Sequence, residues 1–401
     1  MENKNKIVNA APGKAVDVKG VVSSEKDNYK VVHGGVDSLL LFTVLILLAF
    51  GLIMVFSASY ADAQNRYNDS YYFIKHQLIM AVLGLVFMVA ASRVGIRMYK
   101  FVSIPLYAIS IVLLMLVLVI GSAGGGAQRW INIFGIRFQP SEFAKTTLIL
   151  MLAWYYEKNH SKVFDVKDPK RATWYGTFVP LGFIGLICAL VALEKHLSGL
   201  IIIGCIGFCM MIASGIKIKL LMLMAGCGMT LVAAGAMLVD YTRRRILIWI
   251  NPEAYPQDGG WQTIQGMRAI GSGGFFGLGL GNSRLKYSYV SQPQNDFIYT
   301  IVCEELGFIG AVSVILLFGI LVWRGFVIAM RCPDRFAQLV AMGISTKTAL
   351  QVILNIAVVT NVAPNTGISL PFFSYGGTAL VMQLVEMGVL LAISRYSLEK
   401  K

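Results

Sequence analysis

Long, uninterrupted apolar runs constrain this chain more than any other feature of its sequence. A helix needs about 20 mostly apolar residues to cross the ~30 Å hydrocarbon core of a bilayer, and runs near that length recur throughout the 401 residues. Hydrophobic residues make up 56% of the chain and charged residues only 14%, which is far from the balance of a soluble domain. The sequence therefore predicts an all-α polytopic membrane protein.

Ten runs are predicted to be transmembrane helices, and an even number returns both termini to one side. They lie at about 38–58, 72–91, 102–121, 141–156, 176–193, 197–214, 218–239, 298–322, 337–360 and 376–394. Basic residues collect before residue 36 and in alternate connections, so both termini are predicted to be cytoplasmic. We expect residues 1–35 to be a disordered tail and residues 36–401 to be the membrane domain. The net charge of +14 then reflects topology and anionic lipid, and indicates no nucleic-acid partner.

Two connections on the opposite side are long enough to carry function, residues 122–140 and 240–297. The second contains GSGGFFGLGLG, residues 271–281, which lacks the preceding strand and following acidic residue of a nucleotide-binding loop. Its glycines instead favour tight turns and a close approach to another surface or to a ligand. The cysteines show no CxxC or Cys/His spacing, so no zinc site is predicted.

Charged residues lie at both ends of these connections. Glu142 and Lys145 are three residues apart at the start of a span, where they either pair in a polar cavity or act separately, with Glu142 favoured by the helix dipole and Lys145 snorkelling outward. Arg243, Arg244 and Arg245 follow the seventh span on the side where few basic residues are expected. A bound diphosphate and ordinary lipid phosphates both explain them.

Three carboxylates surround the start of the eighth predicted span, in SQPQNDFIYTIVCEELGFIG. Asp296 lies where the loop meets the membrane, either as a helix cap or as a reactive group. Glu304 and Glu305 lie about 12–14 Å deeper in a continuous helix. Because buried membrane carboxylates are costly unless paired, we expect these two to face protein, with Lys347 as a candidate partner.

The same stretch resembles the NDFIF and EELG signature of the shape, elongation, division and sporulation (SEDS) glycosyltransferases, relatives of FtsW, RodA and SpoVE. Further matching segments are GAQRWINIFGIRFQPSEFAK, EKHLSGL, AIGSGGFFGLGLGNSRLKYSYV and PNTGISLPFFSYGGTAL. The matches run in the family's order from about residue 40 to 395, and ten spans is also the family's number. Departures are His196, where many relatives carry Asp, and Thr378, where Ser is common; His196 we expect to be structural.

The resemblance implies a bacterial cytoplasmic-membrane enzyme that polymerises lipid II into glycan strands on the outer face. The family's essential aspartate falls on Asp296, which we predict to be the general base for the acceptor sugar hydroxyl. A diphosphate leaves as a stabilised anion, so one carboxylate and cationic stabilisation suffice. The predicted substrate-binding residues are Glu142, Lys145, Arg129, Arg243, Arg244, Arg245, Lys286, Gln262 and Ser374. A divalent cation, Mg²⁺ or Mn²⁺, is a further candidate to accompany the diphosphate.

The family also implies a class B penicillin-binding protein, a transpeptidase, as partner, together with other division or elongation proteins. Two other functions fit the same residues. A lipid II flippase has similar intramembrane charges, and a non-catalytic scaffold of the division or elongation machinery needs the same fold. The shared motifs do not separate septation, elongation and spore cortex synthesis.

Overall fold

The computed structural model describes most of the chain. The described residues are 29–124, 127–133, 136–165, 167–216, 220–223, 226, 228, 240–255, 259–286 and 293–400. Seven helical segments in this part are long and apolar enough to cross a membrane. They are α2 (Ser38–Tyr67), α3 (Tyr72–Arg93), α4 (Ile96–Ile120), the segment Pro169–Leu193, α13 (Ile298–Arg331), α14 (Arg335–Val359) and α15 (Gly377–Ser394).

Two further helices coincide with predicted spans. The first is α5 (Pro140–Lys158), where Pro140 occupies the first turn and so gives up no hydrogen bond. The second is α9 (Leu197–Ala213), which is apolar but shorter. Nine predicted spans thus have a described helix, whereas most of the predicted span 218–239 lies outside the described residues, and the count of ten is not confirmed.

The segment Pro169–Leu193 is built from three pieces. A short helix α7 (Pro169–Thr173) runs into a π-helical turn η1 (Trp174–Phe178) and then into α8 (Val179–Leu193). Pro180 lies in the first turn of α8, where its missing N–H is tolerated. A single-turn helix α6 (His160–Val163) precedes them.

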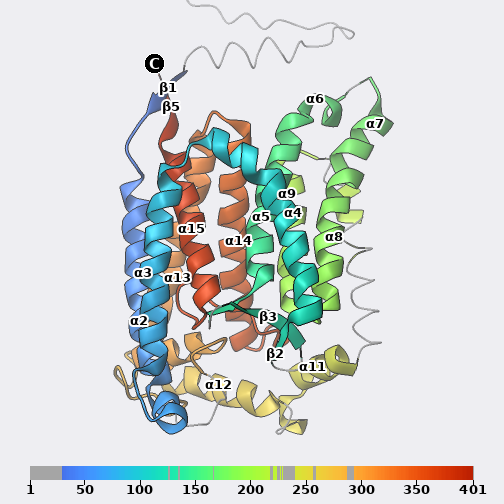
Figure 1. Cartoon of the computed structure of the whole chain (residues 1–401). Helices are drawn as coiled ribbons and strands as arrows, with labels where there is room; N and C mark the ends of the chain where they lie inside the picture. Colours follow the sequence, from blue (N-terminus) through green and yellow to red (C-terminus); the bar gives the residue numbers. More distant parts are fainter. Residues whose placement is uncertain are drawn as a thin grey trace, which may run out of the picture.

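The long helices pack side by side as a bundle, with α14 and α15 the most enclosed (Figure 1). The pair α3 and α15 and the pair α13 and α14 form extensive contacts, and α4 packs against α5. Large apolar side chains on α3 and α4 point outward, including Ile79, Val82, Val86, Phe101 and Val119. Such a wide exposed apolar surface is expected of a helix bundle surrounded by lipid, and the protein is a multi-pass membrane protein.

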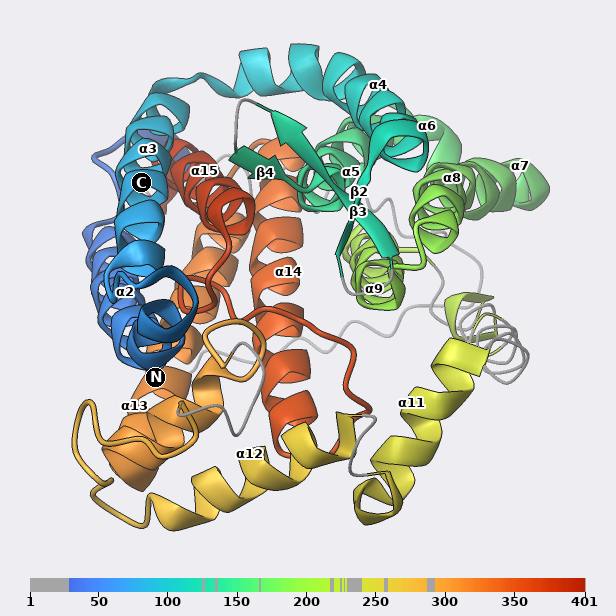
Figure 2. The ribbon, with the colours of Figure 1, turned by 60° about the horizontal axis from the view of Figure 1, so that its bottom comes forward.

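One end of the bundle, which we call the loop end, carries the two long connections (Figure 2). There α11 (Asp240–Ile250), the 3₁₀ turn η2 (Pro252–Ala254) and α12 (Trp261–Ser272) lie along the rim. A small antiparallel sheet crosses the same end, in the order β2 (Ser122–Gly124), β3 (Ala127–Ile133) and β4 (Ile136–Phe138). The predicted loop 240–297 is therefore partly helical.

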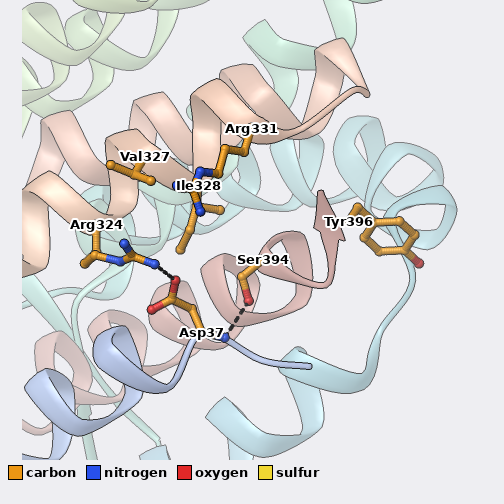
Figure 3. Close-up of a pocket in the computed structure, with 7 residues that line it drawn as sticks. All are labelled: Asp37, Arg324, Val327, Ile328, Arg331, Ser394 and Tyr396. Carbon is orange, nitrogen blue, oxygen red and sulfur yellow. Dashed lines mark hydrogen bonds and ion pairs between the residues drawn. The ribbon is translucent and has the colours of Figure 1, made fainter. Parts of the chain in front are cut away.

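At the opposite end of the bundle, two described strands from the N-terminal and C-terminal parts of the chain pair with each other. Strand β1 (Tyr29–His33) pairs antiparallel with β5 (Tyr396–Lys400). The tail 1–35, predicted to be disordered, thus includes a described strand, while residues 1–28 lie outside the described residues. Arg324 of α13 pairs with Asp37, and the Asp37 amide donates to Ser394 Oγ at 3.1 Å (Figure 3). These contacts line a small pocket that is remote from the loop end.

The glycine-rich segment packs against a kink in α13. Gly307 has φ 66° and ψ −162°, a conformation that favours glycine because it carries no Cβ. The Leu278 amide donates to the Glu304 carbonyl at 3.0 Å, and the Phe308 amide donates to the Gly274 carbonyl at 2.9 Å. Main chain therefore meets main chain at this joint, as the glycine content of residues 271–281 predicts.

Candidate functional site

Asp296 lies in the turn that precedes α13, and neighbouring segments hold the main chain of this turn. Asn355 Nδ2 of α14 donates to the Asp296 carbonyl at 2.9 Å. Ser374 Oγ donates to the Asn295 carbonyl at 2.7 Å, and the Tyr375 amide donates to the Gln294 carbonyl at 2.8 Å. The N-cap of α13 is Phe297, which makes no side-chain capping bond, so the structure does not use Asp296 as the cap.

The loop between α14 and α15 covers the Asp296 carboxylate. A Cβ built on Gly367 would lie 3.0 Å from Asp296 Oδ2, and Gly367 has φ +72°, so a side chain at this position would be both strained and crowded. The same loop receives Arg245 of α11, whose Nη1 donates to the Asn365 carbonyl at 2.6 Å. The loop thus brings Arg245 and Asp296 to one place.

Burial and charge act in opposite directions on Asp296. Burial raises the pKa of its carboxyl group to about 6, and the positive charges of Arg245 and Arg129 offset part of that rise. An acid with a pKa close to the working pH is well suited to accept a proton, because it is mostly ionised and still basic. The electrostatics therefore fit a general base.

The three consecutive arginines do not share one environment. Arg245 is half-buried and acts on Asp296, whereas Arg243 and Arg244 are exposed on α11. Arg129 belongs to a different element, β3, and its Nη2 donates to the Lys195 carbonyl at 2.8 Å. Of the predicted cationic residues, Arg129 and Arg245 are thus the two whose charges act on Asp296.

Glu142 and Lys145 form a buried ion pair in the first turns of α5. Lys145 Nζ lies 2.7 Å from Glu142 Oε1, and Lys145 is only 2% exposed, so it does not snorkel outward. Glu142 lines a small cavity with residues from α14, from the α14–α15 loop and from α15. These are Gln351, Ser369, Leu370, Pro371, Phe372, Ser374, Gly376, Ala379, Leu380 and Gln383.

A second buried ion pair corrects one prediction. Lys347 Nζ lies 2.6 Å from Glu386 Oε2 of α15, and Thr146 Oγ1 donates to the other carboxylate oxygen at 2.5 Å. Lys347 is therefore not the partner of Glu304 or Glu305. The error arose because sequence spacing shows which residues share a helix face and not which helix lies opposite.

Glu304 and Glu305 face protein, as expected, but with other partners. Ser283 Oγ donates to Glu304 Oε2 at 2.5 Å, and Ser57 Oγ donates to Glu305 Oε2 at 2.6 Å. Lys286 is 3% exposed, with Nζ 3.6 Å from Glu305 Oε1. Lys286 thus contacts a buried glutamate of α13, and its role at the diphosphate stays a prediction.

The two remaining candidates differ in how far the structure defines them. Ser374 is buried, and its hydroxyl accepts from the Leu370 amide while it donates to Asn295, so it supports the Asp296 turn. Gln262 is half-buried in the first turn of α12, the helix whose Gly266 packs on the Phe297 ring. Ser374 thus contacts the turn that carries Asp296 directly, and α12 packs against Phe297, the residue that follows Asp296.

Asn355 was missed by the sequence analysis, although a signal was present. It is the one polar residue within the apolar run VILNIAVV, residues 352–359, and a polar residue inside a membrane helix is a candidate functional residue. Among the described residues, no group of three or more His, Cys, Asp or Glu side chains has the arrangement of a metal site.

Comparisons with known proteins agree with this geometry. A family model described as FtsW, RodA and SpoVE, cell cycle protein, matches residues 37–399. The chain is 39% identical to stage V sporulation protein E of Bacillus subtilis over 90% of this chain and 97% of that protein. It is 36% identical to the probable peptidoglycan glycosyltransferase FtsW of Trichlorobacter lovleyi over 89% of this chain and 93% of that protein.

Two solved structures share the fold. One is a chain of a structure described as "Structural coordination of polymerization and crosslinking by a peptidoglycan synthase complex". The two chains superpose with a TM-score of 0.74 and are 27% identical, and the match covers 90% of this chain and 98% of that chain. The other is the rod shape determining protein RodA of Thermus thermophilus, with a TM-score of 0.67 and 26% identity over 90% of this chain and 97% of that chain.

Proposed function

This chain belongs to the FtsW, RodA and SpoVE family, and we propose that it is a peptidoglycan glycosyltransferase that polymerises lipid II. The observation that carries the proposal is the Asp296 carboxylate, fixed at the loop end with its pKa raised to about 6 and flanked by two arginine charges. Relatives named as glycosyltransferases and a neighbour from a peptidoglycan synthase complex support the same activity.

In the proposed reaction Asp296 takes the proton from the acceptor sugar hydroxyl. The hydroxyl oxygen then forms a bond to the anomeric carbon of the donor, while the bond from that carbon to the diphosphate breaks and the electron pair leaves with undecaprenyl diphosphate. An α-linked donor would be inverted to a β-linked product by this direct displacement. No second acid is required, because the diphosphate is a good leaving group, unlike the alkoxide of a glycosidase.

Positive charge near Asp296 has a defined role in this step. The charges of Arg245 and Arg129 act on Asp296, so in this proposal they would also lie near the negative charge that develops on the departing diphosphate. Fixed charges of this kind stabilise a transition state without reorganisation. Among the described residues, no group of three or more His, Cys, Asp or Glu side chains is placed to hold a metal, so the proposed step uses the carboxylate and the two arginines. A divalent cation held with the diphosphate oxygens remains a prediction.

The loop end would face the outside of the cytoplasmic membrane, with both chain ends in the cytoplasm. This orientation agrees with the basic residues of alternate connections. The neighbour's description couples polymerization to crosslinking in a peptidoglycan synthase complex, which supports a crosslinking partner. We propose that this partner is the class B penicillin-binding protein that the family resemblance implies, together with other division or elongation proteins.

Purified lipid II provides the deciding test. We expect glycan strands from the wild-type protein with its cognate transpeptidase, and a loss of about 10²–10⁴-fold with Asp296→Asn. The exposed carboxylate of Glu253, also at the loop end, provides the control variant Glu253→Gln, which should retain activity. Equal polymer from Asp296→Asn would remove it as the base. Translocation of lipid II that is insensitive to Asp296→Asn would instead indicate a flippase, and normal growth with that variant would favour a scaffold.

A further inference from the structure

The turn between α8 and α9 holds a buried acid that the proposed mechanism does not use. Glu194 ends α8 and is 2% exposed, and neither of its carboxylate oxygens has a hydrogen-bond partner among the described residues. Lys195 follows with φ +55°, a left-handed conformation that is uncommon for a residue with a side chain. Because a buried polar group without a partner is costly, Glu194 calls for an explanation in terms of a ligand.

The start of α9 lies in the same turn and is incompletely satisfied. His196 is the N-cap residue, but its side chain makes no capping bond to this 17-residue helix. Ser198 in the first turn is 2% exposed, and its hydroxyl also has no partner among the described residues. The first amide groups of a helix point out of its N-terminus, and together with the dipole they favour an anion.

Arg129 connects this turn to Asp296. Its Nη2 donates to the Lys195 carbonyl, which fixes the guanidinium over the turn from β3. Its positive charge lowers the pKa of both Glu194 and Asp296, so it is close enough to act on both acids. Figure 2 shows β3 lying across the loop end beside α9. The turn therefore lies near the proposed reaction.

The carboxyl group of Glu194 and the imidazole of His196 are both uncharged at neutral pH. Burial raises the pKa of Glu194 to about 8 against the opposing charge of Arg129. Burial lowers the pKa of His196 to about 3, assisted by Arg129 and Lys145 and opposed by Glu142. Nδ1 of the neutral His196 imidazole lies 3.2 Å from Ser141 Oγ. A Cβ built on Gly199 would lie 2.7 Å from this Nδ1.

We propose that the α8–α9 turn, with Arg129, is a binding subsite for the diphosphate of a lipid-linked sugar. This inference rests on the proposed function and assigns a second set of residues to it. Arg129 supplies positive charge, while Ser198 and the first amide groups of α9 donate hydrogen bonds. Glu194 donates through its protonated carboxyl group, since an ionised carboxylate would repel the phosphate.

The placement favours a diphosphate over a general membrane headgroup. The partnerless groups of Glu194 and Ser198 are enclosed, whereas headgroup contacts are expected from exposed basic side chains. Arg129 also acts on Asp296, and the departing diphosphate is attached to the carbon where the reaction occurs. A phosphate group near Arg129 would thus lie close to the chemistry.

Binding of undecaprenyl diphosphate to the purified full-length protein in detergent tests the subsite without requiring turnover. We expect Arg129→Ala and Ser198→Ala to weaken binding, the first by about tenfold or more, as for loss of a charged hydrogen bond. Wild-type binding should weaken about tenfold between pH 7 and pH 9, because Glu194 loses its proton near pH 8 and places a negative charge beside the phosphate.

Glu194→Gln separates this role from a structural one. The neutral amide still donates a hydrogen bond, so binding at pH 7 should stay within about twofold of wild type and should no longer weaken toward pH 9. Glu253→Gln, an exposed carboxylate at the same end, should keep the wild-type profile. Thermal unfolding of each variant checks that it is folded.

Several outcomes would overturn the subsite. One is a folded Glu194→Gln variant that loses binding of undecaprenyl diphosphate at pH 7. Another is wild-type binding that does not change between pH 7 and pH 9. A third is equal affinity for phosphatidylglycerol, which would indicate that the turn binds ordinary lipid headgroups. The proposed function can fail separately. If the wild-type protein forms no polymer but shows this binding profile, the subsite is supported and the proposed function is wrong. If the protein forms polymer but Arg129→Ala and Ser198→Ala bind undecaprenyl diphosphate as the wild type does, the subsite is wrong and the proposed function is unaffected.

Discussion

Asn355 donates a hydrogen bond from its side-chain amide to the main-chain carbonyl of Asp296, at 2.9 Å, from a position one turn before the C-terminal end of α14. The same nitrogen donates to the Ile368 carbonyl at 2.7 Å. One buried amide thus joins the Asp296 turn to the loop that covers its carboxylate. We infer that Asn355 positions the base without touching the substrate.

Asn355→Ala should lower kcat at least tenfold with little change in KM, because the base would lose its fixed orientation. Two buried carbonyl groups would also lose a donor, at a cost of about 1–3 kcal/mol in the free energy of unfolding. Thr360→Ala, at the exposed end of the same helix, is the control. An Asn355→Ala enzyme with unchanged kcat would exclude a positioning role.

The rate of polymerisation should depend on pH through Asp296. Burial raises its pKa to about 6, so kcat/KM should fall as pH decreases through that value and the carboxylate takes up a proton. Arg245→Ala removes a charge that lowers this pKa, so the midpoint should move upward. Arg243→Ala, from an exposed neighbour, should leave the midpoint in place. A midpoint near 4, the ordinary range for Asp, would contradict this environment.

The buried pair of Glu142 and Lys145 should be strongly coupled. Lys145→Ala leaves a buried carboxylate without its cation, which typically costs about 3–5 kcal/mol. The double variant Glu142→Ala, Lys145→Ala should be less destabilised than the sum of the single variants. Thermal unfolding in detergent measures the cycle, with exposed Lys158→Ala as the reference. Additive losses would show that the two charges do not stabilise each other.

Gly307→Ala should damage both stability and activity. A Cβ at this position would lie 2.7 Å from the Phe275 carbonyl oxygen, and the φ of 66° would be strained. Gly319→Ala in the same helix has nothing within 4 Å of the added Cβ and should be tolerated. We expect a lower unfolding temperature and less polymer only for the first variant; equal behaviour of the two would mean that the joint with residues 271–281 is unimportant.

A chelator tests the predicted divalent cation. EDTA should lower polymerisation if a cation accompanies the diphosphate, and Mg²⁺ or Mn²⁺ should restore it in the wild-type protein but not in Asp296→Asn. Full activity in excess EDTA would show that polymerisation needs no divalent cation, and that protein groups such as the arginines stabilise the charge of the diphosphate.

The sequence predicted the helical segments better than their ends. Apolar runs and Pro140 located the start of α5, and the change from polar to apolar residues located α13. In contrast, α2 continues to Tyr67 and α13 to Arg331, well beyond the predicted limits, because a helix persists past the bilayer where a hydrophobicity criterion no longer detects it. The strand pairing of Tyr29–His33 joins segments from opposite ends of the chain, which local patterns do not reveal.

For the candidate site, resemblance and local spacing identified individual residues but not their neighbours. The pair Glu142 and Lys145 lies on one helix, so its spacing was informative. The pairing of Lys347 with Glu386 and the support of Asp296 by Asn355 depend on which helices meet, and that is decided by the packing of the whole bundle.

The pairing of β1 with β5 sets residue 29 opposite residue 400. The membrane domain is therefore nearly a closed ring in its chain path. Joining these two positions through a short linker and opening the chain elsewhere would give a circular permutant with the same helix contacts. A fluorescent donor and acceptor fused at the two positions would report whether the pairing of β1 with β5 opens.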